Sequence, residues 1–173
     1  MFRHLLVPID GSDLSDGTIR RAVSFAREAG ATITFLHVLA NLAMPPQASI
    51  YGDPVLLDPA VVEQFSQAER AYAASLLERA LAMAEEAGVH CDTAVGHHPV
   101  VHEAIIDAAI RHGCDLIFMA SHGRRGLAGL LLGSETQRVL THTDLPVLVF
   151  RRPELPAAGS DPEVQSAPAA PAC

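Results

Sequence analysis

The residues best suited to chemistry in this chain lie in one glycine-rich stretch that joins an apolar run to a predicted helix. Glycine lets backbone N–H groups come close to an anion, and the start of a helix adds further N–H groups and the positive end of the helix dipole. Four glycines are spaced along the stretch: Gly123, Gly126, Gly129 and Gly133. This arrangement predicts a site that binds phosphate.

The helix after the glycines is expected to supply the donors of this site. Ser134 is in position to cap the helix, and Gln137, three residues later, completes a capping-box pattern. The N–H groups of Glu135 and Thr136 then point toward the anion at the positive end of the helix dipole.

The loop matches neither of two common nucleotide-binding motifs. It has no Gly-Lys-Ser/Thr, as a Walker loop would, and it follows the fourth predicted strand, whereas a dinucleotide GxGxxG follows the first. Arg124 and Arg125 add two cations that can contact phosphate oxygens. His122 lies in the same loop, but no nucleophile or orienting acid accompanies it in the sequence, as acid–base catalysis would need. We therefore expect no enzyme, beyond slow hydrolysis of a bound nucleotide.

Short apolar runs alternate with helical patterns along the chain, as is typical of a parallel sheet with helices on both faces. We expect strands at 4–9, 31–39, 89–95, 115–120 and 146–150, helices at 14–30, 60–87, 100–112 and 134–142, and a long loop at 40–59. The predicted fold is α/β, with five parallel strands and helices on both faces of the sheet. Ligands bind such sheets beyond the carboxyl ends of the strands, here after Ile9, Leu39 and Ala120.

Composition narrows the possible functions. The chain has 173 residues, is 49% hydrophobic and carries a formal net charge of −8 at pH 7. The apolar content excludes a wholly disordered chain, and the charge disfavours binding to nucleic acid or acidic lipid. No apolar run is long enough to span a membrane, and residues 1–12 do not resemble a secretory signal. Because the three cysteines are also far apart, we expect a cytoplasmic protein.

The composition changes sharply at residue 152. Proline, alanine, serine, glycine and acidic residues dominate the sequence from there to the end. Such a segment cannot bury a core, so we expect one domain at 1–151 and a disordered tail at 152–173.

Four pieces of sequence together resemble the universal stress protein family. They are Leu6-Val7-Pro8-Ile9-Asp10-Gly11-Ser12, Leu36-His37-Val38, Cys114-Asp115-Leu116-Ile117 and the glycine loop. Nucleotide-binding members of that family carry Gly-x2-Gly-x9-Gly-Ser/Thr, and Gly123, nine further residues, Gly133 and Ser134 match all but the first glycine. Ala120 takes that first position. The resemblance covers residues 3–151 and implies the α/β fold with the strand order 3-2-1-4-5, a homodimer and the binding of ATP with Mg²⁺ or Mn²⁺.

The resemblance also implies which residues contact the nucleotide. Pro8 and Val38 would form apolar walls for the adenine, and Asp10 would face the nucleotide or its divalent ion. Aspartate after a strand can instead serve only the turn, by accepting backbone N–H bonds. The remaining contacts would come from the loop and the helix start: Ala120, Ser121, His122, Gly123, Arg124, Arg125, Gly126, Gly133, Ser134, Glu135 and Thr136.

The last predicted strand, Pro146–Phe150, suggests how the homodimer forms. It is apolar and lies at a sheet edge in the predicted order, and an exposed edge can pair with its copy across a two-fold axis. The proline-rich tail covering that edge is the alternative.

Two other functions are compatible with the sequence. One is a protein-interaction module that kept the fold but lost nucleotide binding, with Ala120 as the cause. The other is a metal-dependent hydrolase in which His98 and His102, near His97, share a helix face and bind zinc. We expect Glu103 to point elsewhere and these histidines to lie at a solvated helix end.

Overall fold

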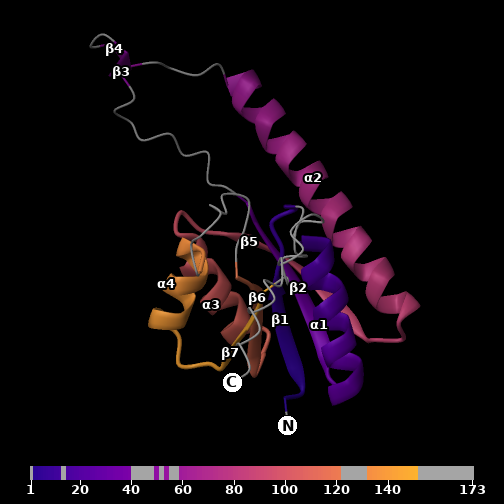
Figure 1. Ribbon diagram of the computed structural model, residues 1–173. Coiled ribbons are helices and arrows are strands. Elements are labelled where there is room, and N and C mark those ends of the chain that lie inside the picture. The colour runs from indigo at the N-terminus through magenta and orange to yellow at the C-terminus, as the bar shows by residue number, and fades with distance from the viewer. Residues whose placement is uncertain are drawn as a thin grey trace, which may run out of the picture.

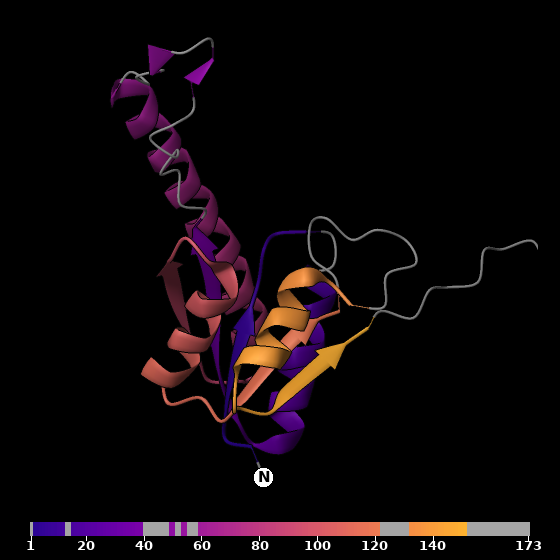
Figure 2. The ribbon, with the colours of Figure 1, turned by 90° about the vertical axis from the view of Figure 1, so that its left-hand side faces the viewer.

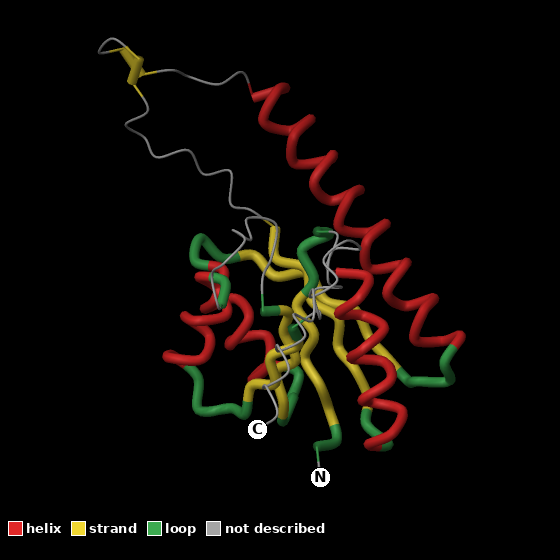
Figure 3. The backbone as a smooth tube through the Cα atoms, viewed as in Figure 1, coloured by secondary structure: helices red, strands yellow, loops and turns green. Residues whose placement is uncertain are grey.

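The structure, a computed structural model, describes residues 2–12, 15–39, 49–50, 53–54, 59–121 and 132–151. Its centre is a five-stranded parallel sheet between two layers of helices (Figure 1, Figure 3). The strands are β1 (His4–Pro8), β2 (Thr32–Leu39), β5 (Cys91–His97), β6 (Leu116–Ala120) and β7 (Val147–Phe150). Their order, β5-β2-β1-β6-β7, is the predicted 3-2-1-4-5.

Two helices cover each face of the sheet. The helices are α1 (Ser15–Ala29), α2 (Pro59–Glu86), α3 (Val101–Arg111) and α4 (Ser134–His142). In Figure 1, α1 and α2 lie on one side of the strands and α3 and α4 on the other. Alternate strand residues serve the two layers: Leu5, Val7 and Phe35 pack with α1 and α2, whereas Leu6 and Leu36 pack with α3.

Helix α2 is 28 residues long, as its composition predicts, and only its second half is buried against the sheet. Ala73, Leu76 and Ala80 are almost completely buried, whereas Phe65 is 58% exposed. The first half of the helix projects beyond the sheet (Figure 1, Figure 2). Within the described ranges, no helix is both long and apolar enough to cross a bilayer.

Two predictions differ from the structure by more than one residue. The third main strand, predicted at 89–95, runs from Cys91 to His97. Val89 belongs to the turn that ends α2: its N–H donates to the Ala84 carbonyl, next to Gly88 at φ +70°. The predicted loop 40–59 contains a pair of two-residue antiparallel strands, β3 (Ser49–Ile50) and β4 (Asp53–Pro54), and α2 begins at Pro59. The other residues of that loop, and the predicted tail at 152–173, lie outside the described residues.

Asp115 aligns the start of β6 with the start of β1. Its carboxylate accepts the N–H groups of Arg3 and His4 at 2.9–3.1 Å. Burial would raise the pKa of Asp115, but these hydrogen bonds to the charged form outweigh it and lower the pKa. β1 and β6 therefore begin at the same level and run side by side to their carboxyl ends, where the predicted site lies.

Candidate functional site

The carboxyl ends of β1, β2 and β6 meet at one edge of the sheet. β1 lies between the other two and pairs in parallel with both. The chain builds the sheet outward from β1 through β2 to β5, and then crosses back through α3 to place β6 on the other side of β1. The strand order therefore reverses beside β1, which is the point where open α/β sheets bind ligands. Of the predicted site residues, Pro8, Asp10, Val38, Ala120 and Ser121 lie at or just beyond these three strand ends.

The two predicted adenine walls are partly exposed. Pro8 ends β1 opposite Leu36, and Val38 lies two residues further along β2. Val38 also packs against the edge of the smaller core cluster and lies opposite Gly96, where a Cβ added to the glycine would be 3.3 Å from Val38 Cγ2. Both side chains are therefore placed at the boundary between the core and the sheet edge.

Asp10 organises the turn between β1 and α1. Its Oδ1 accepts hydrogen bonds from the Ser12 N–H and the Ser15 hydroxyl, both at 3.0 Å. The Ser15 hydroxyl oxygen in turn accepts the Gly11 N–H at 3.0 Å. The aspartate thus has the turn role that its position after a strand predicts, and the same bonds hold its carboxylate at the sheet edge.

Two residues outside the predicted site, Tyr72 and His37, support this turn. Tyr72 of α2 donates from its hydroxyl to the Gly11 carbonyl at 3.3 Å, and its ring meets the edge of His37 at 5.9 Å between centroids. The buried His37 contacts the Ile9 carbonyl through Nδ1 at 2.8 Å. The match at Leu36-His37-Val38 pointed to His37, but Tyr72 lies 61 residues from Gly11 and no local pattern links them.

Replacing Gly11 with alanine should destabilise the protein more than replacing Gly88. Both glycines have positive φ, +73° and +70°, so alanine costs about 1–2 kcal/mol at either position. Only at Gly11 does a Cβ meet another group, because it would lie 1.7 Å from the Tyr72 hydroxyl. In urea unfolding, we expect Gly11→Ala to lower the unfolding free energy by about 1 kcal/mol more than Gly88→Ala does. When Tyr72→Ala is already present, the two glycine substitutions should cost the same. Equal costs for the two alanine variants would contradict the turn geometry.

The start of α4 differs from the prediction. Gly133, and not Ser134, is the N-cap, with extended backbone at φ −67° and ψ 152°, and no side chain caps the helix. The predicted capping box with Gln137 was therefore wrong. The cause is a hydrogen bond from the Gly133 N–H to the Ser121 carbonyl at 2.6 Å, which fixes Gly133 before the first helical turn and leaves Ser134 as the first helical residue.

Two hydrogen bonds tie α4 to the end of β6. One is the bond from Gly133 to Ser121, and the other runs from the buried Thr136 hydroxyl to the Ala120 carbonyl at 3.0 Å. The first turn of a helix offers no internal acceptor for its N–H groups, so those of Ser134, Glu135 and Thr136 have no acceptor within α4. Three helical donors are thereby held beside the strand end, where they can bind an anion.

The middle of the glycine loop is not among the described residues. It includes five of the predicted site residues: His122, Gly123, Arg124, Arg125 and Gly126. The other nine predicted site residues are described, and they lie in the turn after β1, at the ends of β2 and β6 and at the start of α4.

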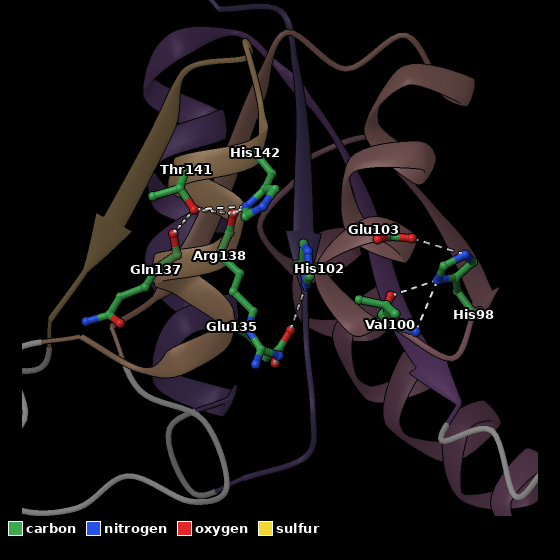
Figure 4. Close-up of polar contacts among 9 residues, drawn as sticks. All are labelled: His98, Val100, His102, Glu103, Glu135, Gln137, Arg138, Thr141 and His142. Carbon is green, nitrogen blue, oxygen red and sulfur yellow. Dashed lines mark hydrogen bonds and ion pairs between the residues drawn. The ribbon is translucent and has the colours of Figure 1, made fainter. Parts of the chain in front are cut away.

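The histidines near α3 do not converge as the zinc hypothesis requires. His97 is the last residue of β5, His98 lies before α3, and His102 is buried toward α4. Figure 4 shows the His98 and His102 rings directed to different partners. The prediction that Glu103 points away from these histidines was wrong, because its Oε2 is 3.4 Å from His98 Nε2. Among the described residues, no group of three His, Cys, Asp or Glu side chains is placed to hold a metal ion.

Strand β7 forms one edge of the sheet. It pairs with β6 from Ile117↔Val147 to Ala120↔Phe150, and in the described part of the chain it is the terminal strand (Figure 2). All four of its residues are partly exposed. The Arg21 guanidinium lies 5.8 Å from the centre of the Phe150 ring.

Comparison with known proteins agrees with this architecture. Universal stress protein YxiE of Bacillus subtilis is 32% identical over 151 residues, which cover 87% of this chain and 100% of the relative. The solved structure of MJ0577 from Methanocaldococcus jannaschii superposes with a TM-score of 0.69 at 26% identity, covering 90% of this chain and 99% of that one. A universal stress protein of Archaeoglobus fulgidus, solved in complex with dAMP, shares the fold at 19% identity with a TM-score of 0.55, covering 85% of this chain and 96% of its own.

The family assignment rests on the sequence as well as the fold. Residues 1–151 match the sequence profile of the universal stress protein family, which is 151 of the 173 residues in the chain. The chain belongs to the universal stress protein family.

Proposed function

We propose that this protein binds ATP at the carboxyl ends of β1, β2 and β6 and acts as a regulatory stress protein. One observation carries the proposal: two hydrogen bonds to the end of β6 hold the first N–H groups of α4 at the edge of the sheet. Donors fixed at a helix start suit a phosphate. The Archaeoglobus relative complexed with dAMP supports the proposal, because it has the same fold and holds an adenine nucleotide.

In this proposal the phosphates lie at Ser134, Glu135 and Thr136, and the adenine lies between Pro8 and Val38. Ala120 and Ser121 line the floor at the end of β6. The family motif implies further phosphate contacts from His122, Gly123, Arg124, Arg125 and Gly126, which lie outside the described residues.

The chemistry of Asp10 suits a divalent ion. Mg²⁺ is usually held by one or two carboxylates together with phosphate oxygens and water. Asp10 offers one carboxylate beside the proposed phosphate position, and its turn contacts fix the orientation of that carboxylate. We propose Asp10 as the protein ligand of Mg²⁺ or Mn²⁺ delivered with ATP. The ion would neutralise phosphate charge when bound.

The proposed role is regulatory. Nucleotide binding would change a surface that protein partners read, in a cytoplasmic homodimer joined through Pro146–Phe150. The edge position and partial exposure of β7 support that interface. Sedimentation of the whole chain gives the oligomeric state directly.

Thermal unfolding with ATP and Mg²⁺ tests the proposal. A ligand that binds only the folded state stabilises it, by about 2.7 kcal/mol at one hundred times its Kd. We expect the melting temperature to rise with ATP concentration, and to rise further for Ala120→Gly, because the added methyl group narrows the pocket. If millimolar ATP leaves the natural protein unchanged but stabilises Ala120→Gly, the chain is the nucleotide-free interaction module. If neither responds, the nucleotide site itself is wrong.

A further inference from the structure

A contact between α3 and α4 has no part in the proposed function so far. His102 Nδ1, on α3, lies 3.7 Å from Glu135 Oε2, on α4. Figure 4 shows the two side chains facing each other across the gap between the helices. Within the described structure, neither of these two buried atoms has a hydrogen-bond partner.

The burial of this pair makes the contact significant. The His102 side chain is only 10% exposed, and that of Glu135 is 35% exposed. A buried carboxylate oxygen without a donor is unfavourable, and the group across the gap that can supply a proton is His102 Nδ1. With the proton on Nδ1, the imidazole faces the carboxylate as a donor.

Arg138 holds Glu135 in the same orientation, and the other polar groups around the pair have partners of their own. Arg138, one turn further along α4, contacts Glu135 Oε1 through Nη1 at 3.0 Å. The His142 ring packs against His102 with 5.0 Å between centroids, while its own Nδ1 contacts the Arg138 carbonyl at 2.8 Å. On α3, Glu103 pairs with His98 and is not directed at His102.

Glu135 has two opposing effects on a bound phosphate. Its backbone N–H is one of the three proposed donors in the first turn of α4, but its side chain carries a negative charge in that same turn. A carboxylate there stabilises the free helix by interacting with its dipole and repels an arriving phosphate. The direction of this side chain therefore affects nucleotide affinity.

We propose that His102 is a positioning residue for the nucleotide site, which holds the Glu135 carboxylate toward α3 and away from the phosphates. This inference rests on the proposed function. It assigns the buried histidine of α3 to the phosphate end of the site, although His102 itself does not touch the ligand.

Calorimetric titration with ATP·Mg and with adenosine tests this role. His102→Ala removes the group that faces Glu135 Oε2 and leaves only Arg138 in contact with the carboxylate. The carboxylate can then turn toward the phosphates, so we expect ATP affinity to fall by about three- to tenfold. Adenosine carries no phosphate, and its affinity should change less than about twofold. His102→Asn keeps a donor near the position of Nδ1 and should bind ATP like the natural protein. His98→Ala is the matched control, because His98 also pairs with an acid but lies away from α4.

The decisive variant adds Glu135→Gln to His102→Ala. With the charge removed, the loss of His102 should no longer matter, and the double variant should bind ATP as tightly as Glu135→Gln alone. If His102→Ala weakens ATP and adenosine equally, or if Glu135→Gln does not restore ATP binding, His102 is merely structural and the inference is wrong. If the natural protein binds neither ligand, the proposed function fails, and the inference fails with it.

Discussion

Replacing Ser134 with aspartate is expected to weaken ATP binding by about tenfold or more without harming the fold. Ser134 is exposed and is the first residue of α4, beside the proposed phosphates. A carboxylate there lies within a few ångströms of the phosphate charge and competes for the same N–H donors. The same charge favours the helix dipole by about 0.3–1 kcal/mol. In Ser134→Asp, the ATP affinity measured by calorimetric titration should therefore fall, while the melting temperature of the ligand-free protein should stay the same or rise.

Asparagine at the same position is the matched control. Ser134→Asn has the size of aspartate and lacks its charge, so we expect at most a few-fold loss of ATP affinity. If the aspartate and asparagine variants bind ATP equally well, the phosphates do not lie at the start of α4. A general loss of stability in Ser134→Asp would also contradict the structure, because an exposed first-turn acid should be tolerated.

Replacing Phe35 with alanine is expected to cost about 3–5 kcal/mol of unfolding free energy. Phe35 is completely buried in β2, where it lies opposite Val7 of β1 and Thr93 of β5. Removing its ring leaves a cavity beneath α1 and α2 that close-packed neighbours cannot fill. A domain of this size has only about 5–15 kcal/mol in total, so the urea midpoint should fall sharply.

Phe65 provides the comparison, because it is the same residue type in a 58% exposed position on α2. Phe65→Ala should change the unfolding free energy by no more than about 0.5 kcal/mol. Similar costs for the two variants would mean that α2 packs differently, with its first half buried and not projecting from the sheet.

The positions of the strands were predictable because local patterns determine them. The apolar runs at 31–39 and 115–120 each lie within about a residue of the observed strands. Their alternation with helices predicts a parallel sheet, whereas the strand order is what the family resemblance implies. Helix ends were also marked, since Gly30, Gly88 and Gly113 adopt the positive φ that ends a helix. The start of strand β5 was harder to predict, because an apolar residue such as Val89 fits both the turn that ends a helix and the first position of a strand.

The details of the site depend on long-range contacts that sequence patterns do not encode. Ser134 matches a cap by residue type, yet a hydrogen bond between Gly133 and Ser121 moves the cap back by one residue. The role of Thr136 depends likewise on the Ala120 carbonyl, sixteen residues away. The contact between His102 and Glu135 joins two helices, so neither residue signals it alone.

Backbone amide chemical shifts during an ATP titration test the central claim most directly. If the phosphates bind the first turn of α4, the N–H signals of Ser134, Glu135 and Thr136 should shift with saturation as ATP·Mg is added, and much less with adenosine. Signals that stay fixed at these three residues, while ATP shifts others or none, would contradict the account.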